Sequence, residues 1–120
     1  MSIFKRLFGK KTSDKGHSEL NQQAVIVYLE GANLPDHIYQ EYDLSTIEDK
    51  LIEVLERYGL GEFDGNEIGP AEAILFMYGP DAERLFVGIE QTLRDYPLCQ
   101  GARVEIRRGG PGAPQREIRL

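Results

Sequence analysis

The stretch Ala24-Val25-Ile26-Val27-Tyr28-Leu29-Glu30 contains the longest unbroken apolar run of the chain. It is rich in β-branched and aromatic side chains and is followed by Gly31, a pattern typical of a buried strand. A second stretch of the same character, Ala71–Tyr78, ends at Gly79-Pro80. Neither run approaches the ~20 apolar residues that a membrane-spanning helix requires. We therefore predict two central, buried β-strands and no membrane span.

Two amphipathic helices are predicted, one after each of these strands. The first has two competing N-cap residues, Asp43 and Ser45, of which Ser45 forms a capping box with Glu48. The second opens at Pro80-Asp81, with Pro80 near the first helical position and Asp81 in the first turn, and it stops before Pro97. In each helix the apolar residues recur at helical spacing and form one face: Ile47, Leu51, Val54, Leu55 and Tyr58 in the first, and Ala82, Leu85, Phe86, Ile89, Leu93 and Tyr96 in the second.

The remaining segments complete one small domain. Residues 32–40 are expected to form a loop, and residues 61–69 a short, irregular edge strand. Arg103–Arg108 alternates charged and apolar residues, as a half-buried strand does, and pairs through the turn Gly109–Pro114 with Gln115–Leu120. The order β-α-β-β-α-β plus one strand predicts an α+β, ferredoxin-like split βαβ sandwich with two helices on one face of an antiparallel sheet. We expect residues 1–23 to be a basic amphipathic segment plus a flexible linker, and residues 24–120 to be the single domain.

The central strands lack the alternation of a sheet with one solvated face. Both alternating sets are apolar in Val25–Leu29 and again in Ala73–Tyr78. We therefore expect the sheet face away from the helices to be at least partly covered. The candidates are a second copy of the chain, the N-terminal segment folding back, and another protein.

Charge is zoned along the 120 residues, whose net charge is −6. Residues 1–15 carry +4, residues 16–101 carry −13 and residues 102–120 carry +3. An acidic body repels a phosphate backbone, so nucleic-acid binding is not expected. It suits either a basic protein partner or a plain solvated surface.

The N-terminal segment Met1–Lys11 is basic and amphipathic but has no apolar h-region or cleavage site of a secretory signal. On a helix its apolar side chains cover one arc, and the basic pair lies outside it. Three interpretations stay open: peripheral membrane contact, docking on its own chain or another protein, and a disordered tail. The candidate residues of this segment are Ile3, Phe4, Lys5, Arg6, Leu7 and Phe8.

The central strands also suggest a surface for a partner. Aromatic residues on them come near arginines of the following strand in the predicted plan, a combination found where sheets stack RNA bases. The second central strand lacks the RNA-binding signature and its surroundings are acidic, which favours dimer or core packing instead. The candidate partner or dimer surface consists of Tyr28, Phe76, Tyr78, Arg103 and Arg107.

Residues 62–72 are rich in carboxylates but resemble a calcium-binding loop only in part. Asp64-x-Asn66 resembles the start of such a loop, but its twelfth position is Leu75 where a bidentate Glu is needed. A solvated hairpin is the preferred interpretation, and no metal site is predicted. The acidic and amide residues considered are Glu62, Asp64, Asn66, Glu67 and Glu72.

The sequence shows no arrangement of residues that indicates a catalytic site. Cys99 is the single cysteine, which excludes an internal disulfide and favours a reducing cytosol. Nothing places His17 or His37 beside it, so we interpret Cys99 as a packed thiol and both histidines as surface residues. The Gly109–Pro114 segment lacks the Lys-Ser/Thr of a phosphate-binding loop and is interpreted as a turn. No cofactor is predicted.

Parts of residues 60–120 resemble a pattern in small bacterial proteins to which no activity is assigned. The resemblance rests on Phe63–Gly69, Ala73–Ala82, Val104–Gly112 and Arg116–Leu120. In size and plan the chain is also similar to small ferredoxin-like regulators and to bacterial immunity proteins. The resemblance implies a fold but supplies no functional residue.

Two function classes follow. The leading hypothesis is a non-enzymatic, cytoplasmic binding or regulatory module that forms homodimers or binds a protein; an immunity-like version blocks a basic toxin with its acidic body. Peripheral contact with the inner membrane surface through residues 1–11 is compatible with it. The alternative is a ferredoxin-like enzyme or ligand sensor with a small molecule at a sheet or dimer interface. Its polar groups would be Tyr28, Tyr78, His37 and Arg103.

Overall fold

The structure, a computed structural model of the chain, describes residues 22–30, 34–70 and 72–120. The candidate segment Ile3–Phe8 and most of the predicted linker lie outside the described residues. Their proposed contacts therefore stay predictions.

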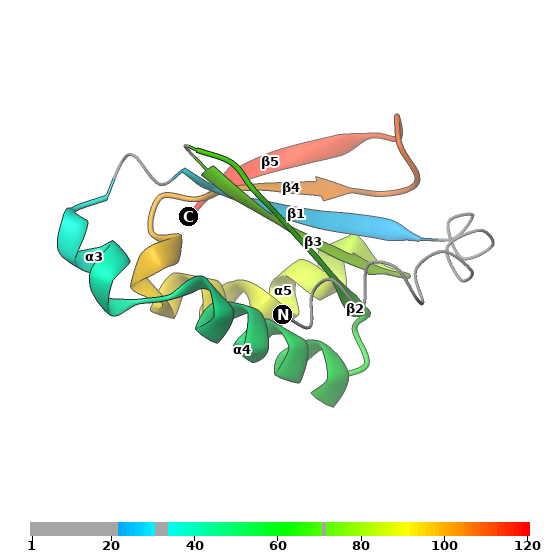
Figure 1. Cartoon of the computed structure of the whole chain (residues 1–120). Coiled ribbons are helices and arrows are strands. Elements are labelled where there is room, and N and C mark those ends of the chain that lie inside the picture. The colour runs from blue at the N-terminus through cyan, green and yellow to red at the C-terminus, as the bar shows by residue number, and fades with distance from the viewer. Residues whose placement is uncertain (1–21, 31–33, 71) are drawn as a thin grey trace.

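Five strands and three α-helices make up the described chain (Figure 1). A short 3-10 helix, η2, follows the last α-helix. In chain order the elements are β1 Gln23–Glu30, α3 Asp36–Glu41, α4 Leu44–Arg57, β2 Glu62–Ile68, β3 Glu72–Gly79, α5 Ala82–Asp95, η2 Pro97–Cys99, β4 Arg103–Arg107 and β5 Gln115–Arg119.

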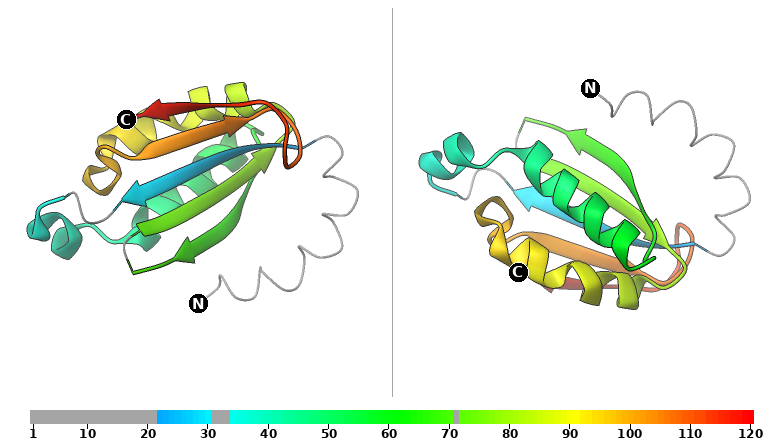
Figure 2. Two further views of the ribbon diagram at one scale, coloured as in Figure 1. Left: turned by 90° about the horizontal axis from the view of Figure 1, so that it is seen from above. Right: turned by 90° about the horizontal axis from the view of Figure 1, so that it is seen from below.

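The strands form one antiparallel sheet in the order β2-β3-β1-β4-β5. Helices α4 and α5 cover one face of it, and the described chain leaves the other face open (Figure 2). The fold is thus α+β, as predicted. It departs from a four-stranded two-helix sandwich by the added edge strand β5 and by the helix α3, which lies beyond the end of β1 (Figure 1).

The hydrophobic core lies between the sheet and helices α4 and α5. From β1 it takes Val25, Val27 and Leu29, which are at most 5% exposed. The predicted apolar faces of both helices supply most of the rest: Ile47, Leu51, Leu55, Ala82, Leu85, Phe86, Ile89 and Leu93. Burying a side chain of this size stabilises the fold by about 1.5–3 kcal/mol, so this layer supplies the main driving force for folding.

The N-termini of both long helices correct the sequence prediction. Asp43 caps α4, since its Oδ1 accepts a hydrogen bond from the Thr46 amide at 3.2 Å. Ser45 lies inside the helix, so the predicted capping box does not form. Asp81 is likewise the N-cap of α5 rather than a first-turn residue, and it accepts from the Arg84 amide at 3.1 Å. A carboxylate at each cap satisfies a free amide and suits the positive end of the helix dipole.

Glu48, the expected capping-box partner of Ser45, has a structural role instead. Its side chain is 6% exposed and accepts a hydrogen bond from Nδ2 of Asn66 in β2. This bond joins α4 to the edge strand, next to the β-bulge between Phe63 and Gly65. The predicted irregular edge strand is therefore confirmed. Asn66 is not the solvated residue that the sequence suggested.

Residues 32–40 are not a plain loop, because Asp36–Glu41 forms helix α3. The helix is six residues long and has no fully buried side chain. Its end is fixed by Tyr42, which packs edge-to-face on Tyr96 with ring centroids 5.5 Å apart. The Tyr96 hydroxyl donates to the Asp43 carbonyl at 2.7 Å. So short a helix carries little apolar periodicity, which is why the pattern did not predict it.

The added strand β5 is attached by ion pairs as well as by its ladder with β4. On the helix side, Arg116 donates to Glu83 of α5 at 2.6 and 2.8 Å, and Arg108 reaches the same carboxylate at 3.1 Å. These hydrogen bonds, Arg116 first, lower the pKa of Glu83 to about 2. Arg119 donates to Glu30 of β1 at 3.1 Å and to the Gly101 carbonyl. Strand β5 is therefore held to the helix layer through Glu83 and to the central part of the sheet through Glu30.

Gly79 ends β3 at a point where no side chain fits. A Cβ there would overlap the carbonyl oxygen of Leu60 and come within 3.1 Å of Leu85 Cδ1. We expect Gly79→Ala to lower the free energy of unfolding by about 1–3 kcal/mol or more, as overpacking does. Gly110→Ala is the control, because a Cβ at Gly110 meets nothing within 4 Å; we expect a change within ~0.5 kcal/mol. Urea unfolding measures both, and equal midpoints would contradict this packing.

Candidate functional site

The sheet face that α4 and α5 leave uncovered is called here the open face (Figure 2). The strand register gives it a regular arrangement of side chains. Since alternate residues of β1 point into the core, Ala24, Ile26 and Tyr28 point the other way. The strand register then places one residue of each neighbouring strand beside them. From β2 to β4 the three rows are Glu62, Tyr78, Ala24 and Arg107; Gly65, Phe76, Ile26 and Glu105; and Glu67, Ile74, Tyr28 and Arg103. Beyond the third row the same register pairs Glu72 of β3 with Glu30 of β1 at the end of this face.

The two middle columns form an apolar strip, defined as Ala24, Ile26, Tyr28, Ile74, Phe76 and Tyr78. Ala24 is fully buried and Ile26 is 6% exposed. The four larger side chains are half-buried. The sequence led us to expect a covered face, and within the chain this cover is partial: neighbours shield the centre while aromatic surface reaches solvent.

Tyr28 is held in place from two sides. Its hydroxyl donates to Glu105 Oε1 at 3.0 Å, and the Arg103 guanidinium lies 3.8 Å from its ring centroid. Arg103 also donates to the other Glu105 oxygen at 3.0 Å. Burial, followed by the Glu105 hydrogen bond, raises the pKa of Tyr28, so the phenol stays protonated. The result is a preorganised aromatic side chain with a stacked cation, a combination that costs little entropy on binding.

The charged columns on either side of the apolar strip differ. On β2, Glu62 and Glu67 make no ion pair with any other described residue. On β4, Arg103 forms ion pairs with Glu105 and, at 3.7 Å, with Glu30. Arg107 donates to the Gly109 carbonyl at 2.9 Å and has no ion pair within the described chain. The open face is thus acidic along β2, apolar in the centre and mixed with two arginines along β4.

All five residues named from sequence as a partner surface lie on the open face: Tyr28, Phe76, Tyr78, Arg103 and Arg107. Their role in binding stays a prediction. The same placement corrects the alternative hypothesis, in which four polar groups form one small-molecule site. Tyr28, Tyr78 and Arg103 point away from the helices, and His37 is exposed on α3, so these four groups do not converge.

The acidic residues of β2 and of the start of β3 are those whose sequence was compared with a calcium loop. Within residues 22–30, 34–70 and 72–120 no group of three or more His, Cys, Asp or Glu side chains is placed to hold a metal ion. The register puts Glu62 and Glu67 on the open face, while Asn66 turns to Glu48. The segment Gly109–Pro114 joins β4 to β5 as a hairpin connection, as predicted.

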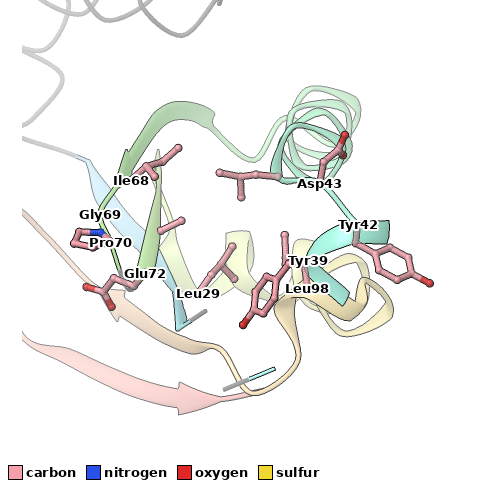
Figure 3. Close-up of a pocket in the computed structure, with 11 residues that line it drawn as sticks. Leu29, Tyr39, Tyr42, Asp43, Ile68, Gly69, Pro70, Glu72 and Leu98 are labelled. Carbon is pink, nitrogen blue, oxygen red and sulfur yellow. The ribbon is translucent and has the colours of Figure 1, made fainter. Parts of the chain in front are cut away.

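A pocket of about 620 Å³ opens at the end of the sheet beside α3 (Figure 3). It lies between the β2–β3 turn, the end of β1, the α3–α4 junction and η2. Its lining is mainly apolar: Leu29, Tyr39, Tyr42, Asp43, Leu44, Ile68, Gly69, Pro70, Glu72, Ala73 and Leu98. Tyr39 accepts a hydrogen bond from the Leu34 amide at 3.2 Å. The Thr46 hydrogen bonds lower the pKa of Asp43, so this rim group is a carboxylate at neutral pH.

The sequence did not predict this pocket, because α3 was expected to be a loop. Its walls come from four segments that only the tertiary fold brings together. The one available signal was the pair Tyr39 and Tyr42, two aromatic side chains in and just after the segment expected to be a loop.

Neither the helices of the described chain nor comparison with known proteins assigns a function to these sites. In the described part of the chain no helix has the length and apolar character needed to cross a bilayer. Comparison of the sequence and structure with protein families, curated proteins and solved structures finds no match.

Cys99 lies in η2 and is fully buried. Burial raises the pKa of its thiol to about 12. We expect Ellman's reagent at pH 8 to modify the native protein on the order of a thousandfold more slowly than the urea-unfolded chain, because only the thiolate attacks. Reaction of the native protein at the unfolded rate would show that Cys99 is an accessible nucleophile.

Proposed function

We propose that this chain is a non-enzymatic binding module that acts through protein–protein contact at the open face. The observation that carries the proposal is the apolar strip with its charged columns on the central strands. Aromatic residues and arginine dominate the energetics of protein interfaces, and both gather here around Tyr28. The buried, high-pKa thiol of Cys99 argues against this residue as a covalent nucleophile.

We also propose that the domain follows the ferredoxin-like split βαβ plan. Support comes from the β1-α4-β2-β3-α5-β4 sequence of elements and from the position of both long helices on one face. On this view β5 and α3 are additions to the plan. The plan predicts fold alone, and the function rests on the open face.

The charge pattern bears on the kind of protein partner. The immunity-like version of the hypothesis needs an acidic surface for a basic toxin. The open face is acidic along β2 and at the Glu30–Glu72 end, and Arg103 and Arg107 on β4 oppose a uniformly basic partner. A partner with both charge signs on its surface therefore fits better. Cytoplasmic location and peripheral membrane contact through residues 1–11 remain part of the proposal.

Site-specific photocrosslinking tests the open face. Phe76 is replaced by p-benzoylphenylalanine in the full chain, which is expressed in its natural host. Val87→p-benzoylphenylalanine is the matched control, because Val87 is an apolar side chain on α5 and is 71% exposed. We expect a protein adduct from position 76 only, with the crosslinked peptide identified by mass spectrometry. No adduct at 76, or equal adducts at both positions, would contradict the proposal.

A second candidate function is favoured by the pocket beside α3. Its volume of about 620 Å³ lies within the range of sites for small ligands, roughly 300–1,000 Å³. The apolar lining and the Asp43 carboxylate suit an apolar molecule that carries a neutral or cationic polar group. This is the ligand-sensor alternative, with the site moved from the sheet face to the end of the sheet.

Fluorescence of N-phenyl-1-naphthylamine, an apolar amine, tests the pocket in the full chain. We expect binding to be weakened at least tenfold by Ala73→Phe, which fills the pocket, because the dye then loses most of its apolar contact. Val87→Phe, on the far side of α5, should leave binding unchanged. Unchanged binding in Ala73→Phe, or loss of binding in Phe76→Glu instead, would place the dye outside the pocket.

A further inference from the structure

We propose that the partner of the open face is a second copy of this chain, related by a twofold axis that runs parallel to the strands between β1 and β3. This inference rests on the proposed function and names its partner. It is derived from the three rows of the open face and from the symmetry that a dimer of identical surfaces must obey.

The rows are self-complementary under this axis. Rotation places the β2 column of one copy over the β4 column of the other, and the β3 column over the β1 column, while each row stays in its place. Glu62 then faces Arg107, and Glu67 faces Arg103. Opposite charges therefore meet along the β2 and β4 sides of the interface, where they are partly exposed and help to fix the register. Beyond the third row Glu72 faces Glu30, a contact between like charges in which Glu30 is already paired with Arg119 and Arg103.

The apolar strip matches in size as well as in character. Tyr78 faces Ala24, the largest side chain of the strip above the smallest, and Phe76 faces Ile26. Ile74 faces Tyr28, whose ring is fixed by Arg103 and Glu105. Alternation of large and small residues across facing positions is what allows two sheets to interdigitate at ~10 Å.

Gly65 faces Glu105 in the middle row. Glu105 already accepts hydrogen bonds from Tyr28 and Arg103, so it brings its own partners into the interface. Because Gly65 has no side chain, no second carboxylate approaches Glu105. The acidic column of β2 is therefore interrupted at the one row where its partner column carries a negative charge.

The other face-to-face axis is unfavourable. A twofold axis perpendicular to the strands, through the middle row, would place each column over itself. Glu62 would then face Glu67, and Arg103 would face Arg107. Like charges facing each other weaken an interface, so the charge pattern selects the axis parallel to the strands.

The available area points to a reversible dimer. The four strands that overlap across this axis, at ~4.8 Å spacing and about 26 Å of strand length, give a plan area of roughly 500 Å². This is somewhat below the ~800 Å² per partner of a standard stable interface. The mass in solution should therefore depend on protein concentration.

Charge reversal in the full chain tests the partner and the axis together. We expect Glu62→Arg and Arg107→Glu each to raise the dimer dissociation constant about tenfold or more, measured by sedimentation equilibrium. An equimolar mixture of the two variants, and the double variant, should recover association, because each restores opposite charges across the axis. Glu56→Arg and Arg84→Glu, exposed changes of the same charge on α4 and α5, are the controls and should have no such effect.

The possible outcomes distinguish the proposed axis, the identity of the partner and the proposed function from one another. Tighter association of Glu62→Arg would overturn the axis, because it is the result that the perpendicular axis predicts. A monomeric full chain at all concentrations, together with a crosslink from position 76 to a different protein, would overturn the second copy and leave the proposed function standing. A monomer without any crosslink would overturn both.

Discussion

The two central strands are apolar on both sides, and most of the structure depends on this constraint. On one side Val25, Val27 and Leu29 join the apolar faces of α4 and α5, and this layer drives folding. On the other side the same strands place Tyr28 and Phe76 on a face that no described element covers. A strand that is apolar on both sides leaves apolar surface on the face opposite the core. That surface is covered either by neighbouring residues within the sheet or by a partner.

The strands that flank the apolar strip cover part of that surface. On β4, Arg103 lies over the Tyr28 ring while Glu105 accepts a hydrogen bond from its hydroxyl, so both faces of contact with this aromatic side chain are polar. On β2, Glu62 and Glu67 make no ion pairs among the described residues. A self-complementary face depends on this difference between β4 and β2, because equal charges on the two strands would leave the orientation of a second copy unspecified.

Sequence patterns predicted the strands, the long helices and their apolar faces well, because burial on one or both sides leaves a clear period in Ala24–Glu30 and in residues 82–96. They failed where local alternatives compete. Asp43 rather than Ser45 caps α4, and six residues of α3 carry too little periodicity to be recognised. The site was predicted in part: Tyr28, Phe76 and Arg103 were named from alternation. Glu62 and Glu67 were interpreted as part of a solvated hairpin, since their place opposite the arginines depends on strand register, which one sequence does not specify.

If the open face binds a second copy of this chain, association must persist without the N-terminal segment. Sedimentation equilibrium of the full chain and of a chain that begins at Gln22 measures this. We expect a concentration-dependent shift towards twice the 13.6 kDa mass for both chains, because every residue of the proposed interface lies after Gln22. A single 13.6 kDa species for both chains at every concentration would contradict it.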